Sequence, residues 1–224
     1  MSSSLEGLEL ETATAPQWGV IWLHGLGADG NDFAPIVPEL VRPHWPALRF
    51  VFPHAPVRPI TINNGVRMRG WYDITSFDFA DRADRQGVLE SVAQVEALIA
   101  REQERGIPPE RLLLAGFSQG GAITLAAGLR RQVPLAGLIG LSTYLPDAAH
   151  AAEHLAAGAQ RQPIFMAHGG SDPVIPMAHA RTSAQALQQL GFDVEWRDYP
   201  MAHQVCAEEI ADLAAWMERR FSAA

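Results

Sequence analysis

The sequence contains no lysine, because all 17 of its basic residues are arginine. Schiff-base chemistry, serine–lysine dyads and P-loop nucleotide hydrolysis each require a lysine amine and are therefore excluded. Cysteine is almost absent as well, since Cys206 is the only one in 224 residues. No disulfide can form within the chain and no cysteine-rich zinc site can be built. This usage fits a reducing compartment.

Positive charge is scarce relative to negative charge, and the formal net charge is −8 at pH 7. An acidic surface repels phosphate backbones, so nucleic acid is not an expected partner. Residues 112–129 carry no charge and are long enough to span a membrane, but several glycines and a Ser-Gln pair interrupt them. This pattern favours a buried strand, turn and helix, so no stable membrane insertion is expected.

Short apolar runs alternate with segments of helical periodicity, and neither an internal repeat nor a linker divides residues 1–224. Strands are expected at residues 17–23, 48–52, 111–115, 135–141, 163–167 and 192–199. Helices are expected at residues 88–99, 122–129, 177–190 and 207–221. Apolar strands that alternate with helices predict one α/β domain with a mostly parallel sheet covered on both faces. In such sheets the chemistry lies beyond the carboxyl ends of the strands.

A serine lies between two glycines at the end of one expected strand, in the pattern Gly116-x-Ser118-x-Gly120. This spacing is typical of a nucleophile elbow, a sharp strand-to-helix turn that exposes the serine hydroxyl. Side chains two residues before and after the serine would clash in so tight a turn, and glycine removes both clashes. The following helix directs its positive end toward a developing oxyanion.

Two further polar residues follow later strands, and with Ser118 they give the chain order serine, aspartate, histidine. Asp172 follows the strand at 163–167, and His203 follows the strand at 192–199. A serine hydroxyl needs a base to become nucleophilic, so we predict His203 as the base and Asp172 as the group that orients it. The oxyanion needs two backbone donors, which we assign to the N–H groups of Gln119 and of Leu26 in a glycine-rich loop.

The sequence resembles the phospholipase/carboxylesterase family of small α/β-hydrolases, which includes acyl-protein thioesterases. The resemblance rests on residues 22–30, 52–56, 68–74, 116–121, 168–176 and His203, and so covers nearly the whole chain. It implies a cofactor-free serine esterase of α/β-hydrolase fold with the triad Ser118, Asp172 and His203, in the cytoplasm and often a homodimer. The substrate is expected to be a small-molecule or lipid ester, and acyl-protein thioesters or lysophospholipids are the alternative.

About twenty residues separate the strands at 135–141 and 163–167, so no large cap domain is expected and the site should be open. We expect an apolar substrate wall made by Leu26, Trp71, Val174 and Ile175. Residues 58–79 are long and irregular by pattern, and we expect this segment to fold over the groove and carry Trp71 toward it. For Trp71, packing in the core is slightly favoured over a place in the substrate wall.

Two other functions remain open at this stage. Residues 150–154 spell His-Ala-Ala-Glu-His, a zinc-protease pattern, so a zinc hydrolase at His150, Glu153 and His154 is one alternative. The other is a hydrolase-fold binding protein without activity, which an intact triad argues against.

Overall fold

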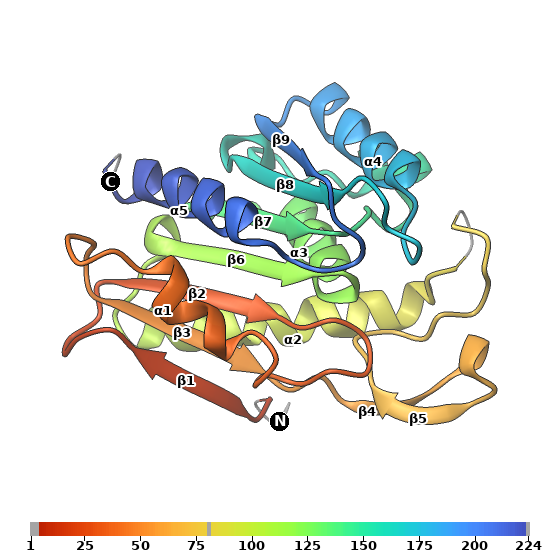
Figure 1. Cartoon of the computed structure of the whole chain (residues 1–224), viewed down its shortest axis with the longest axis horizontal. Coiled ribbons are helices and arrows are strands. Elements are labelled where there is room, and N and C mark those ends of the chain that lie inside the picture. The colour runs from red at the N-terminus through yellow and green to blue at the C-terminus, as the bar shows by residue number, and fades with distance from the viewer. Residues whose placement is uncertain (1–4, 80–81, 223–224) are drawn as a thin grey trace.

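The computed structural model, which describes residues 5–79 and 82–222, is built around a seven-stranded sheet in the order β1-β3-β2-β6-β7-β8-β9 (Figure 1). Its strands are β1 (Gly7–Glu11), β2 (Trp18–Leu23), β3 (Leu48–Pro53), β6 (Leu112–Phe117), β7 (Gly137–Leu141), β8 (Ile164–Gly169) and β9 (Val194–Tyr199). Only β1 is antiparallel to its neighbour. The other six strands therefore end at one common edge.

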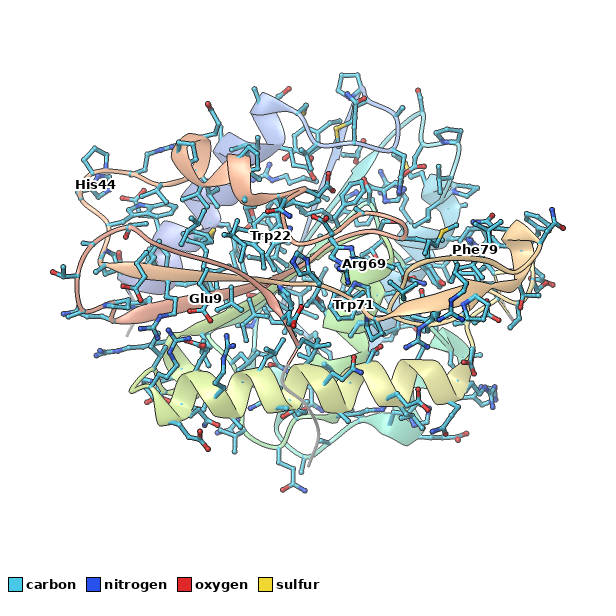
Figure 2. All side chains as sticks on the ribbon, turned by 90° about the horizontal axis from the view of Figure 1, so that it is seen from below. Glu9, Trp22, His44, Arg69, Trp71 and Phe79 are labelled. Carbon is cyan, nitrogen blue, oxygen red and sulfur yellow. The ribbon has the colours of Figure 1, made fainter. Side chains whose placement is uncertain are left out.

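Helices cover both faces of the sheet and enclose two apolar layers. The helices are α1 (Val37–Leu40), α2 (Arg85–Glu104), α3 (Gln119–Arg130), α4 (Met177–Gln189) and α5 (Ala207–Phe221). The apolar residues of α2, α3 and α4 pack on one face, and α5 packs with the α1 region on the other. Figure 2 shows this arrangement, with α2 below the sheet and α1 and α5 above it. The alternation of strands and helices predicted this mostly parallel, covered sheet, and the architecture is the α/β-hydrolase fold that the family resemblance implied.

Every strand and helix that the sequence analysis expected is present, with boundaries that shift by a few residues. The central strands β2, β3, β7 and β8 are buried along their whole length, as continuous apolar runs require. The alternating pattern of β9 matches its place at the end of the sheet, where one side remains in contact with water. Residues 112–129 form β6 and α3, and no helix among the described residues is long and apolar enough to cross a membrane.

The sequence analysis missed β1, which lies at the other edge of the sheet. Its burial alternates between partly buried and exposed residues, so its pattern carries few large apolar side chains. Charges hold it in place: Glu9 lies 2.7 Å from Arg101 on α2 and 2.9 Å from Arg105, the residue that caps the end of this helix. Glu102, fully buried, joins this network through Arg105 at 2.8 Å and Arg49 at 3.0 Å.

The expectation that residues 58–79 are irregular was wrong for the first half of the segment. Strands β4 (Val57–Ile60) and β5 (Val66–Arg69) form an antiparallel hairpin at the sheet's carboxyl edge. Asn64 and Gly65 both have positive φ, at 54° and 74°, which suits the turn that reverses the chain. The hairpin brings the next segment, with Trp71 and Tyr72, back under the end of the sheet.

Candidate active site

Ser118 lies at the turn between β6 and α3, in a backbone conformation that few residues adopt. Its φ is 54° and its ψ is −120°. A Cβ atom on Gly116 would lie 2.5 Å from Gly121 N, and one on Gly120 would lie 2.6 Å from His24 O. Both distances are shorter than real Cβ contacts, so only glycine fits at these two positions. The steric argument for the Gly-x-Ser-x-Gly spacing therefore holds in the structure.

Three side chains from three strand ends form one line of hydrogen bonds. The Nε2 atom of His203 lies 2.9 Å from the Ser118 hydroxyl, and its Nδ1 atom lies 2.7 Å from Asp172 Oδ2. The carboxylate of Asp172 is shielded from solvent, whereas His203 remains 17% exposed. If Nδ1 carries the proton that faces Asp172, then Nε2 is free to accept a proton from Ser118.

The carboxylate of Asp172 is fixed by its own loop before it meets His203. Its Oδ1 atom accepts hydrogen bonds from the N–H groups of Val174 at 2.8 Å and Ile175 at 2.9 Å. The buried ring of His168 donates from Nε2 to Ile175 O at 2.8 Å, and burial lowers the pKa of this histidine. Neutral His168 thus supports the loop that presents Asp172. The sequence analysis gave His168 no role, although it lies in the strand end that carries the acid.

Two backbone N–H groups beside Ser118 have no partner within the part of the chain that the structure describes. They belong to Gln119, the first residue of α3, and to Leu26. The turn that contains Leu26 is close to the serine, because a Cβ atom on Gly25 would lie 3.5 Å from Ser118 Cβ. Unpaired donors at a helix N-terminus next to a hydroxyl can stabilise a negative oxygen that forms there.

The loop that carries Leu26 is held by His24. The His24 ring lies 2.7 Å from Gly25 O through Nδ1, and its Nε2 atom accepts the Ala55 N–H at 3.0 Å. Because one ring nitrogen accepts, the other must donate, so the ring is neutral, and burial lowers its pKa. The indole N–H of Trp71 donates to His24 O at 2.9 Å. His24 is therefore a bracing group.

The side chain of Gln119 performs a task that the sequence analysis did not foresee. Its Oε1 atom accepts the Trp71 N–H at 2.8 Å, and its Nε2 atom donates to Tyr72 O at 2.7 Å. Ser91 on α2 donates its hydroxyl to Trp71 O. The segment after the β4–β5 hairpin is thus fastened to the residue that follows the nucleophile.

Of the four residues of the expected substrate wall, two are accessible to a ligand and two are buried. Val174 is 49% exposed and Leu26 is partly buried, so both can meet a ligand. Trp71 is fully buried between the sheet and α2 (Figure 2) and Ile175 is 2% exposed, so in this structure neither presents a surface to substrate. Packing was the correct interpretation for Trp71. Phe77, which the sequence analysis did not select, is 79% exposed a few residues further along the same segment.

The histidines of the zinc pattern lie away from the triad on η4 (Ala148–His154), a 3₁₀-helix. Such a helix places residues three apart on one side, so His150 and His154 do not form the paired ligands of an α-helical zinc motif. Both contact Asp147, at 2.6 Å and 3.7 Å. Among the described residues no group of three or more potential ligands is arranged to hold a metal ion, so the geometry does not favour the zinc alternative.

Comparison with known proteins agrees with this geometry. A sequence model described as Phospholipase/Carboxylesterase matches residues 10–220. The chain belongs to this family. It is 34% identical over 234 residues to acyl-protein thioesterase 1 of Cryptococcus neoformans, covering 97% of this chain and 98% of the relative. It is 35% identical over 207 residues to a probable carboxylesterase of Oryza sativa, covering 91% and 78% of the two chains.

A solved structure supports the same assignment. Acyl-protein thioesterase 2 of Zea mays superposes with a TM-score of 0.84 at 25% identity, covering 96% of this chain and all of that one. This member of the phospholipase/carboxylesterase family is therefore an enzyme, a serine hydrolase that acts on esters.

Proposed function

We propose that this hydrolase cleaves carboxylic esters through an acyl-enzyme on Ser118, with His203 as general base and acid and Asp172 as the residue that orients it. The observation that carries the proposal is the unbroken line of hydrogen bonds from Asp172 through His203 to Ser118, next to two unpaired backbone donors. This arrangement needs no cofactor.

In the first half of the reaction, His203 Nε2 accepts the Ser118 proton as the serine oxygen attacks the ester carbonyl. The carbonyl oxygen becomes negative and is stabilised by the N–H groups of Leu26 and Gln119. Asp172 stabilises the imidazolium that forms. His203 then gives its proton to the departing alcohol, and the acyl group remains on Ser118.

In the second half, a water molecule attacks the acyl-enzyme while His203 accepts its proton. The same two N–H groups stabilise the second negative intermediate, and the acid leaves as the proton returns to Ser118. Each donor contributes about 3 kcal/mol to transition-state stabilisation in enzymes of this kind. Leu26 and Gln119 act through backbone atoms, so their identity matters less than the local fold.

A thioester of an acylated protein is a second candidate substrate. The relatives from Cryptococcus neoformans and Zea mays are named acyl-protein thioesterases. In this chain the exposed Phe77 and Val174 supply apolar surface near the segments that hold the site, without a large cap domain above them. The acyl-enzyme chemistry is unchanged, since only the leaving group differs.

The decisive experiment is hydrolysis of p-nitrophenyl esters from acetate to palmitate, beside matched acyl thioesters, with the Ser118→Ala variant in parallel. We expect the variant to lose nearly all turnover while its circular dichroism stays unchanged. Turnover that falls steeply with chain length supports a carboxylesterase for short acyl groups. Turnover that holds with length and is higher on thioesters supports the second candidate. Near-normal turnover by Ser118→Ala would refute both.

We also propose a cytoplasmic location for the enzyme. The lone Cys206 leaves no disulfide to form within the chain, which suits a reducing compartment. Recovery of the activity in the membrane or secreted fraction of the native host would contradict it.

A further inference from the structure

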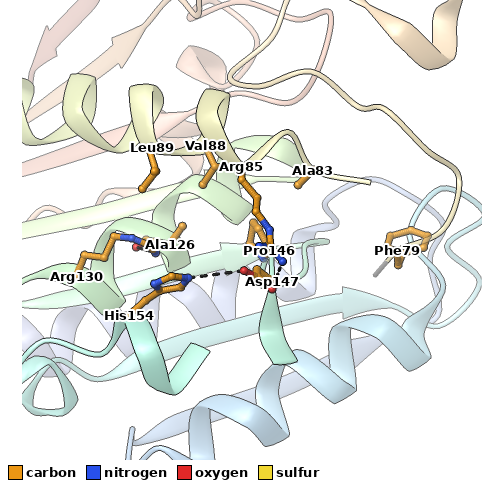
Figure 3. Close-up of a pocket in the computed structure, with 10 residues that line it drawn as sticks. All are labelled: Phe79, Ala83, Arg85, Val88, Leu89, Ala126, Arg130, Pro146, Asp147 and His154. Atoms are coloured by element: carbon orange, nitrogen blue, oxygen red, sulfur yellow. Dashed lines mark hydrogen bonds and ion pairs between the residues drawn. The ribbon is translucent and has the colours of Figure 1, made fainter. Parts of the chain in front are cut away.

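A cavity of about 320 Å³ lies outside the active site, between α2, the carboxyl-terminal half of α3 and the segment that follows β7. Figure 3 shows Val88 and Leu89 of α2 directed at this cavity from one side, with Arg130 and His154 opposite them. The cavity is separate from the triad. Ser118 is the N-cap of α3 and Arg130 is its last residue, so the two lie about 18 Å apart along the helix axis.

One wall of the cavity is apolar and partly open to water. Val88 and Ala126 form its buried part, and Leu89 is 47% exposed at its edge. A surface of this kind contacts a hydrocarbon chain favourably, because each methylene group that it removes from water makes binding more favourable. The size is at the lower end of the range for small-molecule sites.

The opposite side carries more positive than negative charge. Among the described residues that line the cavity, Asp147 is the only acid, and it is shared by Arg85 at 3.3 Å and His154 at 3.7 Å. It also contacts His150, outside the cavity, at 2.6 Å. One carboxylate therefore faces several cationic or potentially cationic groups (Figure 3).

Arg130, in the last turn of α3, is complemented by the carboxyl end of its helix but not by a carboxylate among the described residues. Its guanidinium donates to Ala126 O of its own helix at 2.9 Å, and no carboxylate of the described residues lies within 4.0 Å of it. Burial lowers the pKa of Arg130, and only Asp147 acts in the opposite sense. A half-buried cation without an acidic partner gains free energy when an anion binds beside it.

From these features we propose that the cavity binds an amphiphilic carboxylate, a carboxylic acid with an unbranched chain of medium length. Its carboxylate lies at Arg130, and its chain lies against Val88, Leu89 and Ala126. The acids that ester hydrolysis releases belong to this class. That link to the product rests on the proposed function, whereas the binding site itself does not.

Octanoate is the probe, and isothermal titration calorimetry on the full chain is the measurement. The protein is first labelled at Ser118 with a serine-directed phosphonate, verified by mass, so that the catalytic groove is blocked. We expect one equivalent of octanoate to bind the labelled protein. We expect octanol to give no signal, because it lacks the carboxylate. Acetate lacks the chain and should bind at least about a hundredfold more weakly than octanoate.

Variants assign the binding to the cavity. Arg130→Gln should weaken octanoate binding at least about tenfold, and Arg130→Lys should restore much of it. Leu89→Asn should weaken the binding of octanoate, but the variant should still require the charged carboxylate of the ligand. Arg161→Gln, an arginine on η5 (Ala159–Arg161) outside the cavity, is the matched control and should bind as the parent does.

Three results would overturn the proposal: no binding to the labelled protein, equal binding of octanol, or unchanged binding by a folded Arg130→Gln variant. If the phosphonate fails to label Ser118, the proposed function fails instead. The cavity is then tested in the same way in the Ser118→Ala protein, so the two failures are distinguishable.

Discussion

Replacing Asp172 with asparagine tests the triad through an effect that the surrounding loop makes unusually specific. Oδ1 of Asp172 accepts two backbone N–H groups, from Val174 and Ile175, and Oδ2 faces His203 Nδ1. In Asp172→Asn the amide has one oxygen and one NH₂ group. The two N–H donors require the oxygen on their side, so the NH₂ group is turned toward His203.

That orientation reverses the hydrogen bond to the histidine. The asparagine donates to Nδ1, so the proton of the neutral ring moves to Nε2, the atom that should accept the Ser118 proton. Loss of the correct tautomer in a triad costs about 10⁴ in kcat, or ~5 kcal/mol of activation free energy. The change is nearly isosteric and keeps both backbone contacts, so the fold should persist.

Turnover of p-nitrophenyl acetate and the rate of phosphonate labelling are the assays. Both should fall by about 10⁴ in Asp172→Asn, while the urea midpoint changes little. Asp198→Asn is the matched control, because Asp198 lies on β9 near the site but pairs with Arg181 at 2.8 Å. Activity within tenfold of the parent in Asp172→Asn would refute this account of the triad, and so would an equal loss in Asp198→Asn.

Three other perturbations have expected outcomes. Gln119→Leu leaves the N–H of Trp71 and the C=O of Tyr72 buried without partners. It should therefore lower the free energy of unfolding, measured by urea titration, by ~2–4 kcal/mol. A loss below ~0.5 kcal/mol would show that water replaces the side chain. Glu102→Gln removes a fully buried charge paired with arginines and should cost ~3–5 kcal/mol in the same assay, whereas a neutral result would mean that the network contributes nothing. Burial lowers the pKa of His24, so the unfolded state binds more protons below pH of about 6.5 and stability should fall as the pH drops from 7 to 5. His24→Asn should reduce that slope and leave the part that buried His168 contributes; a slope that His24→Asn leaves unchanged would contradict the assignment.

The central strands, the flanking helices and the order of the polar residues were predictable because each leaves a local pattern. A strand buried on both faces must be apolar throughout, as β2 and β8 are. The glycines around Ser118 are required by contacts within a few residues of the turn or with the adjacent strand end. Each of these signals depends on short-range geometry, which a sequence shows directly.

Strand β1 and the β4–β5 hairpin were not predictable, since partners distant in sequence stabilise them. Strand β1 alternates polar and apolar residues and is fixed by Arg49, Arg101 and Arg105. The β4–β5 hairpin is short, and its two strands are largely exposed. Their sequences alone bury too little apolar surface to indicate a strand. The charges that hold β1 come from residues up to about a hundred positions away.

Trp71 shows how a residue near the site can be found while its role stays divided between a substrate wall and the core. An indole in a segment near the active site suits a substrate wall, and nothing adjacent in the sequence decides whether the ring faces outward. Gln119 decides it, from 48 residues further along the chain, by fastening the backbone of Trp71 so that the indole N–H reaches His24 O. The same residue leaves its own N–H unpaired beside Ser118. Gln119 therefore links the two proposed oxyanion donors: its own backbone N–H is one of them, and its side chain holds the tryptophan that supports the loop of the other.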